Sequence, residues 1–96
     1  MEHISIITVN YRQPEATIAF LESLQEQSFQ NYEVVLIDNA PLVDHSADFS
    51  AACPNLKLII NPDNIGFAAA NNQGMSIAEG DFFFLLNNDT IVTEGF

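Results

Sequence analysis

Basic residues are scarce in this sequence: Lys and Arg together number 2, against 13 Asp and Glu, and the formal net charge is -11. So acidic a chain repels phosphate backbones and anionic lipid, which argues against nucleic acid and membrane-surface partners. The single cysteine, Cys53, excludes an internal disulfide and indicates a reducing compartment. No apolar run approaches the roughly 20 residues of a membrane span, and the first residues do not resemble a signal peptide. These absences predict a cytoplasmic location.

The residues that are present have the composition of a globular domain. Hydrophobic residues make up 48% and charged residues 16% of the 96 positions, which argues against disorder. A chain of this length holds one domain at most, and it contains no internal repeat or low-complexity linker. We therefore predict a single domain over residues 1–96.

Apolar, β-branched stretches alternate with helical patterns along the whole chain. Four stretches are typical of buried strands, at 4–9, 32–38, 56–61 and 81–87. Three helical segments lie between them, at 12–27, 47–53 and 66–80. Because the strands are apolar throughout and alternate with helices, we predict an α/β fold with three layers, in which helices cover both faces of a mainly parallel sheet.

Every predicted strand ends in polar residues. In an open parallel sheet, ligands bind in the crevice beyond the carboxyl ends of the strands. The polar residues expected at that edge are Asn10, Tyr11, Asp38, Asn39, Asn61 and the segment 87–90. We therefore expect the binding site at this edge of the sheet.

The last strand passes directly from five apolar residues into Asn87, Asn88, Asp89 and Thr90. A carboxylate with neighbouring amide and hydroxyl oxygens suits a hard divalent cation such as Mg²⁺ or Mn²⁺, with water and ligand phosphate as the remaining ligands. The alternative is a polar turn in which these side chains satisfy backbone groups. The spacing alone does not decide between the two.

Two charged residues that follow predicted strands also have two interpretations each. Asp38 is placed to accept a hydrogen bond from a base or a sugar hydroxyl, or to form an Asx-turn or helix cap. Arg12, the only basic residue near this edge, pairs either with a diphosphate or with Glu15. The residues leave both questions open.

The last predicted helix opens with small residues. Gly66 lies at its start, where backbone N–H groups and the helix dipole can hold an anion. The small residues that follow, including Gly74, could equally let the helix pack closely on the sheet. Asn71 and Asn72 carry amides that point either to the strand ends or to solvent. Neither GxGxxG nor GxxxxGKS is present, so neither the Rossmann fingerprint nor the P-loop applies.

A family resemblance is carried by three segments together: "SIITVNYRQPEATIAFLESLQEQSFQNYEVVLIDNA", "NIGFAAANNQG" and "GDFFFLLNNDT". In this order and spacing they resemble the donor-binding half of a family-2 glycosyltransferase, most closely its rhamnosyltransferase-like branch. The resemblance covers nearly the whole chain. It implies the GT-A fold, a Rossmann-like nucleotide-diphospho-sugar transferase fold, and a donor expected to be a UDP- or dTDP-linked sugar.

The resemblance also implies roles for individual residues. With the candidates above, it predicts a donor site formed by Val9, Asn10, Tyr11, Arg12, Asp38, Asn39, Gly66, Asn71, Asn87 and Asn88. The segment 87–90 aligns with the DxD-type motif of the family, so Asp89 is expected to hold Mg²⁺ or Mn²⁺ on the donor diphosphate. The metal would neutralise a diphosphate that this acidic chain otherwise repels.

The chain departs from the family pattern in two places. Asn71 stands where many members carry Arg, which removes a possible phosphate contact. The chain also stops at Phe96, before the acceptor-binding half in which inverting members carry an Asp or Glu base. We therefore expect a truncated chain or split domain that has no catalytic residue and binds donor only.

In the complete enzyme, the resemblance implies transfer to a glycan or lipid-linked acceptor in polysaccharide or cell-envelope glycan synthesis, with a possible peripheral membrane location. An uncovered sheet edge in the truncated chain predicts a homo-oligomer. The alternative is a non-catalytic nucleotide-binding or interaction module that keeps the fold.

Overall fold

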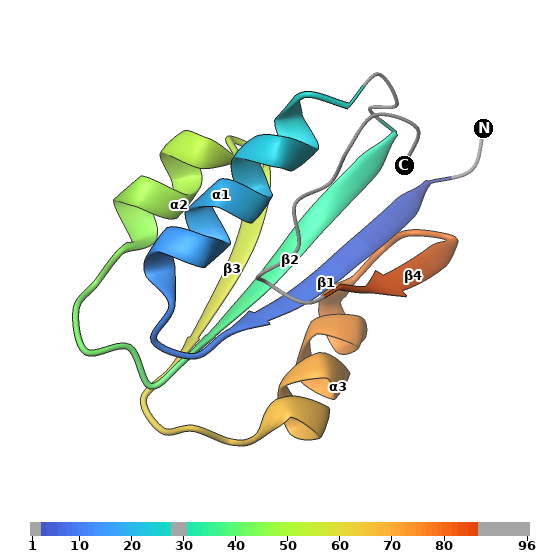
Figure 1. Ribbon diagram of the computed structural model, residues 1–96. Coiled ribbons are helices and arrows are strands. Elements are labelled where there is room, and N and C mark those ends of the chain that lie inside the picture. The colour runs from blue at the N-terminus through green and yellow to red at the C-terminus, as the bar shows by residue number, and fades with distance from the viewer. Residues whose placement is uncertain (1–2, 28–30, 87–96) are drawn as a thin grey trace.

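The computed structural model describes residues 3–27 and 31–86. Its sheet has four parallel strands in the order β3-β2-β1-β4, formed by β1 (Ile4–Asn10), β2 (Tyr32–Asn39), β3 (Leu56–Asn61) and β4 (Phe82–Leu85). The strands alternate with the helices α1 (Pro14–Gln25), α2 (Ser46–Ala52) and α3 (Phe67–Ile77). Helices α1 and α2 lie on one face of the sheet and α3 lies on the other (Figure 1). The predicted three-layer α/β fold is confirmed.

Successive side chains of β1 and β2 point to opposite faces of the sheet, so both strands place apolar residues on both faces. The core under α1 and α2 contains Ile6, Val34, Leu36, Phe20, Leu21, Leu24 and Phe49. The core under α3 contains Ile7, Val35, Ile37 and Ala70. These two layers of packing hold β1 and β2 rigidly at the centre of the molecule.

The small residues of α3 let this helix lie close to the sheet. A Cβ atom added at Gly74 would lie 2.7 Å from Cγ2 of Ile7 and 2.8 Å from Cδ1 of Ile37, closer than such atoms approach. Ala70, one turn earlier, is fully buried. Close packing is therefore the reason for these small residues.

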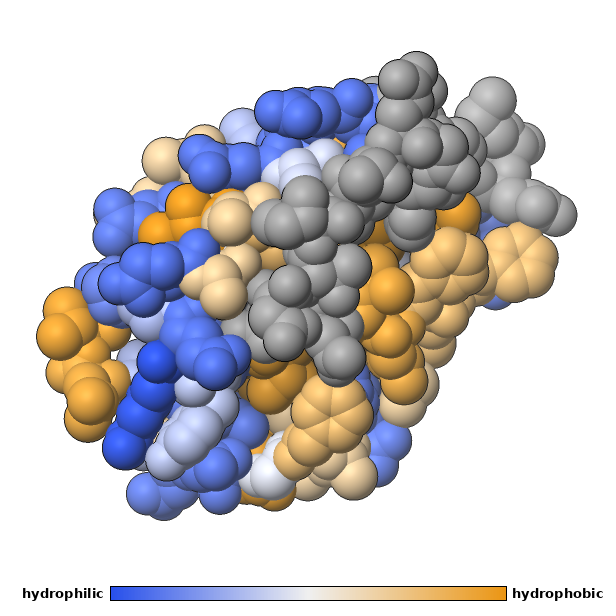
Figure 2. All heavy atoms as spheres, in the orientation of Figure 1, coloured by the Kyte–Doolittle hydropathy of each residue, from blue (hydrophilic) through white to orange (hydrophobic). Residues whose placement is uncertain are grey.

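Strand β4 corrects the expectation that the run of phenylalanines is buried. Its four residues, Phe82 to Leu85, are each between 41% and 50% exposed. β4 pairs with β1 on one side and is the last strand of the sheet within the described residues. Hydrophobic side chains gather on this side of the molecule, at the right of the view in Figure 2. The predicted homo-oligomer stays a prediction, because the structure describes one chain.

The strand order reverses at β1. β2 and β3 follow on one side of it, through connections that carry α1 and α2, while β4 lies on its other side and is reached through α3 (Figure 1). In open α/β sheets, ligands bind beyond the carboxyl ends of the strands where the order reverses. The carboxyl end of β1 is therefore the place to look for a site. None of the described helices is long and apolar enough to cross a membrane.

Candidate functional site

Asn10 and Asp38 are paired at the carboxyl ends of the two central strands. They are partners in the register of β1 and β2, and the side-chain amide of Asn10 donates a hydrogen bond of 2.9 Å to Oδ1 of Asp38. Oδ1 of Asn10 accepts bonds from the backbone N–H of Gln13 (3.1 Å) and the hydroxyl of Thr17 (2.8 Å). Asn10 thus fixes the start of α1 and the Asp38 carboxylate at once.

The Asp38 carboxylate is held at the end of β2 although it is only 1% exposed. Burial raises the pKa of Asp38, while the hydrogen bond from Asn10 opposes this rise. Within the described ranges Asp38 caps no helix, and its second oxygen, Oδ2, has no protein donor. This arrangement removes the helix-cap alternative for Asp38.

Tyr11 and Arg12 form the loop that follows β1. Arg12 has a positive φ of 57°, its Nε donates a 3.1 Å hydrogen bond to the carbonyl of Ala40, and its guanidinium lies 5.0 Å from the centroid of the Tyr11 ring. In the part of the chain that the structure describes, no ion pair joins Arg12 to Glu15. Tyr11 is 45% exposed, so its ring is available to a ligand.

A network of amide side chains joins the ends of β2 and β3 to the start of α3. Asn61 exchanges two hydrogen bonds of 2.9 Å with Gln73 and donates one of 2.8 Å to Asn39. Asn39 in turn donates to Asn64, whose Oδ1 also accepts the backbone N–H of Gly66 at 3.0 Å. The network fixes the loop before α3. The backbone N–H of Gly66, which the sequence predicted as part of an anion site, donates its hydrogen bond to Asn64 instead.

The remaining predicted site residues are placed as follows. Val9 is partly buried and packs on the α3 side of the sheet. Asn71 is 5% exposed and donates to the carbonyl of Phe67, one turn earlier in its own helix. Asn87, Asn88 and Asp89 lie outside the described residues. The roles predicted for all of them in donor binding remain predictions.

A pocket of about 190 Å³ lies beside Asn10, between the loops that follow β1 and β2. It is lined by Asn10, Arg12, Pro14, Pro41, Leu42, Val43 and His45. The sequence pointed to Asn10 and Arg12 but not to Pro41, Leu42 or His45. These three follow β2 in a turn-rich segment, where no periodic pattern identifies pocket residues.

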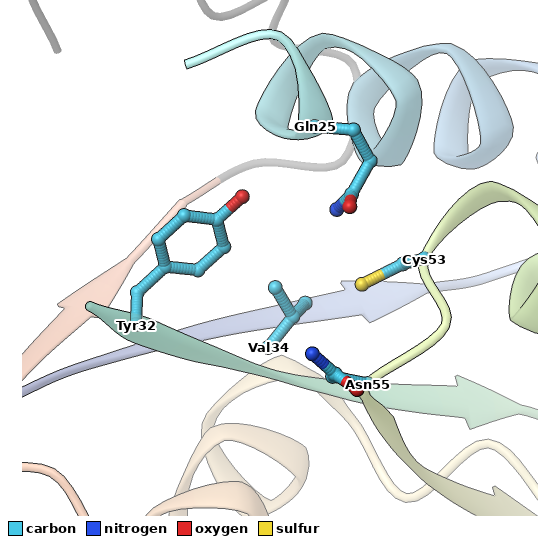
Figure 3. A pocket seen from close by; sticks show the side chains of 5 residues that line it. All are labelled: Gln25, Tyr32, Val34, Cys53 and Asn55. Atoms are coloured by element: carbon cyan, nitrogen blue, oxygen red, sulfur yellow. The ribbon is translucent and has the colours of Figure 1, made fainter. Parts of the chain in front are cut away.

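A smaller cavity lies toward the opposite end of the sheet. Gln25 from α1, Tyr32 and Val34 from β2, and Cys53 and Asn55 before β3 converge on it (Figure 3). Its volume of about 30 Å³ suits a single water molecule. Burial raises the pKa of the Cys53 thiol, which disfavours the reactive thiolate. The carboxyl edge of the sheet is therefore the stronger candidate site.

Comparison with known proteins identifies the family and the fold. Residues 5–96 match the model of the family described as glycosyl transferase family 2. The glycosyltransferase GlyG of Streptococcus pneumoniae is 30% identical, over 97% of this chain and 32% of its own length. The chain spans about a third of the length of the curated relatives it matches.

Solved structures show the same fold. The S. aureus TarS 1-349 structure in complex with UDP has a TM-score of 0.79 and 26% identity, over 91% of this chain and 27% of that one. The Pyrobaculum calidifontis mannosyltransferase PcManGT, solved with GDP-Man and Mn²⁺, has a TM-score of 0.81 at 22% identity, over 92% of this chain and 28% of that one. Both neighbours are GT-A glycosyltransferases. The chain therefore belongs to glycosyl transferase family 2 and has the GT-A fold.

Proposed function

We propose that the carboxyl edge of the sheet binds the nucleotide of a UDP- or dTDP-linked sugar, and that the protein acts as a glycosyltransferase on this donor. The observation that carries the proposal is the buried Asp38 carboxylate, which Asn10 holds at the carboxyl edge next to the pocket that Asn10 and Arg12 line. The imide N–H of uracil or thymine and the hydroxyls of ribose are donors that such a carboxylate accepts. The likeness to TarS, whose structure contains UDP, supports this choice of nucleotide.

The diphosphate of the donor needs a counter-charge, because the chain has a net charge of -11. We assign Asp89 as the carboxylate ligand of Mg²⁺ or Mn²⁺, with Asn87 and Asn88 beside it. Within residues 3–27 and 31–86, no group of three or more His, Cys, Asp or Glu that could hold a metal is found. One carboxylate with amide oxygens fits a hard cation that keeps water and phosphate oxygens as its other ligands. When bound, the ion neutralises the departing diphosphate.

In the proposed reaction, a hydroxyl of a glycan or lipid-linked acceptor attacks the anomeric carbon of the donor sugar. The new C–O bond forms as the bond from that carbon to the diphosphate oxygen breaks, the hydroxyl proton passes to an Asp or Glu base, and the configuration inverts. The residues described here bind and orient the donor, and none of them is assigned as the base. Such positioning lowers the barrier by fixing the sugar where the acceptor attacks. The product would belong to a polysaccharide or cell-envelope glycan.

Calorimetric titration of UDP and dTDP, with and without Mn²⁺, tests the proposal. A hydrogen bond to a charged group contributes about 1.5–3 kcal/mol, so Asp38→Ala is expected to weaken UDP binding roughly tenfold to a hundredfold. Asp89→Ala is expected to remove the dependence on Mn²⁺. Glu22→Ala, an exposed acidic position on α1, removes the same charge and serves as the control.

Two results would count against the proposal. Equal affinities of wild type and Asp38→Ala would contradict the role of Asp38. Absence of UDP and dTDP binding under every condition would contradict the proposed function as a whole.

A further inference from the structure

Two residues with positive φ lie at equivalent places in the loops after β1 and β2. Arg12 (φ 57°) is two residues beyond Asn10, and Ala40 (φ 47°) is two residues beyond Asp38. A residue other than glycine adopts this conformation at a cost of about 1–3 kcal/mol, and it does so where surrounding contacts enforce it. The contacts made by these two residues therefore need an explanation.

The two residues are joined to each other and to β3. Nε of Arg12 donates a 3.1 Å hydrogen bond to the carbonyl of Ala40, whose own N–H donates a 2.9 Å bond to the carbonyl of Asn61. These two hydrogen bonds therefore connect the segments at the carboxyl ends of β1, β2 and β3. Arg12 supplies the side chain that connects the first loop to the other two.

The Arg12 side chain also lies over the partly exposed ring of Tyr11. The guanidinium carbon of Arg12 lies 5.0 Å from the Tyr11 ring centroid, within the range of a cation–π contact. Tyr11 remains 45% exposed. Within the described part of the chain, the Arg12 guanidinium forms no ion pair. Its observed contacts are with the loop of β2 and with Tyr11.

We propose that Arg12 is a positioning residue that holds the Tyr11 ring in place for stacking against the nucleobase of the donor, an inference that rests on the proposed function. A ring fixed by its neighbour loses less conformational freedom when a ligand binds, and this raises affinity without a new ligand contact. Arg12 then acts on the base through Tyr11. The competing role is direct contact with the diphosphate, which the sequence also allowed.

Uridine and UDP distinguish these roles, because uridine carries the base and ribose but no phosphate. If Arg12 acts through Tyr11, Arg12→Asn weakens both ligands by the same factor, roughly two- to fivefold for a cation–π contact at an exposed site. If Arg12 contacts the diphosphate, the change weakens UDP and leaves uridine unaffected. Asn is chosen because it tolerates positive φ, so the loop keeps its conformation.

A double-mutant cycle in the 96-residue chain, read by NMR titration of uridine and of UDP with the diamagnetic ion Mg²⁺, completes the test. Once Tyr11→Ala has removed the ring, Arg12→Asn is expected to have no further effect on uridine, whereas independent contributions would add. Glu22→Gln, at an exposed position of α1, changes the net charge by one unit away from this loop and is the control. In a Tyr32→Phe background, near-UV circular dichroism at wavelengths beyond the phenylalanine bands reports on Tyr11 alone, and Arg12→Asn is expected to reduce this signal.

The outcomes separate the inference from the function on which it rests. Additive effects of Tyr11→Ala and Arg12→Asn, or a loss confined to UDP, overturn the role of Arg12 and leave donor binding intact. A wild-type chain that binds neither uridine nor UDP overturns both. An unchanged Tyr11 dichroism signal in Arg12→Asn shows that Arg12 does not order the ring and also contradicts the inference.

Discussion

Replacing Glu33 by Gln is expected to destabilise the fold by about 3 kcal/mol at pH 7. Glu33 lies in β2 with only 10% of its side chain exposed, and Nζ of Lys57 lies 2.8 Å from its Oε1. Its Oε2 accepts hydrogen bonds from the Ser5 hydroxyl (2.5 Å) and the backbone N–H of Glu79 (2.6 Å). The carboxylate thereby joins β1, β3 and the turn that leads from α3 into β4.

The magnitude follows from the pKa of this carboxyl. Burial opposes ionisation, but the bonds from Lys57, Ser5 and Glu79 outweigh it and lower the pKa of Glu33 from 4.5 to about 2. A shift of this size corresponds to about 3 kcal/mol between the charged and neutral forms. Because the folded-state pKa is lowered, the stabilisation is fully present above pH 4.5 and is lost as the pH falls through about 2. Gln has the shape of the neutral form and lacks the stabilisation at every pH.

Urea unfolding and thermal unfolding, both followed by circular dichroism at several pH values, measure this loss of stability. For a domain of this size, a loss of about 3 kcal/mol lowers Tm by roughly 12–24 °C. Glu22→Gln, at an exposed position of α1, is the matched control and should change stability by less than about 0.5 kcal/mol. The reasoning would be refuted if Glu33→Gln were as stable as wild type at pH 7, or if the difference persisted unchanged from pH 7 to pH 2.

Two further changes test buried polar groups of the central strands. Burial raises the pKa of Asp38 above its usual 3.8, so stability is lost as the pH rises from 3.8 through the raised value. Asp38→Asn should therefore unfold at higher urea concentration than wild type at pH 7 but not below pH 3.8, and a less stable variant at pH 7 would contradict this. The buried Thr8 hydroxyl has no hydrogen-bond partner among the described residues, so Thr8→Val should stabilise the fold by about 1 kcal/mol. A lower Tm for Thr8→Val would show that the hydroxyl is satisfied.

The sequence was sufficient for the architecture, because the apolar runs of β1 and β2 place apolar residues on both faces of the sheet and alternate with helical patterns. It placed Asn10 and Asp38 correctly at the carboxyl edge, since polar residues end both strands. It did not show that β4 is exposed. The run Phe82–Leu85 has the hydrophobicity of a central strand, and its edge position depends on how the other strands pair.

The side-chain contacts at the carboxyl edge could not be predicted either, because they also depend on how the strands pair and where the helices lie. The amide of Asn61 meets Asn39 and Gln73 only because of the register of β2 and β3 and the placement of α3. Arg12 was expected to pair with a diphosphate or with Glu15, whereas the structure places its side chain against Ala40 and Tyr11. Its positive φ sets the direction of that side chain, and no composition or spacing rule predicts such a conformation at an arginine.

The most direct test of the account is to map UDP on the chain by two-dimensional ¹H–¹⁵N NMR in the presence of Mg²⁺, which is diamagnetic. The account predicts that UDP shifts the backbone amides at the carboxyl edge, around Tyr11, Asp38 and Ala40, and leaves those around Tyr32 and Gly80 at the opposite end unchanged. Shifts confined to the opposite end, or no shifts at saturating UDP, would contradict the assignment of this edge as the donor site.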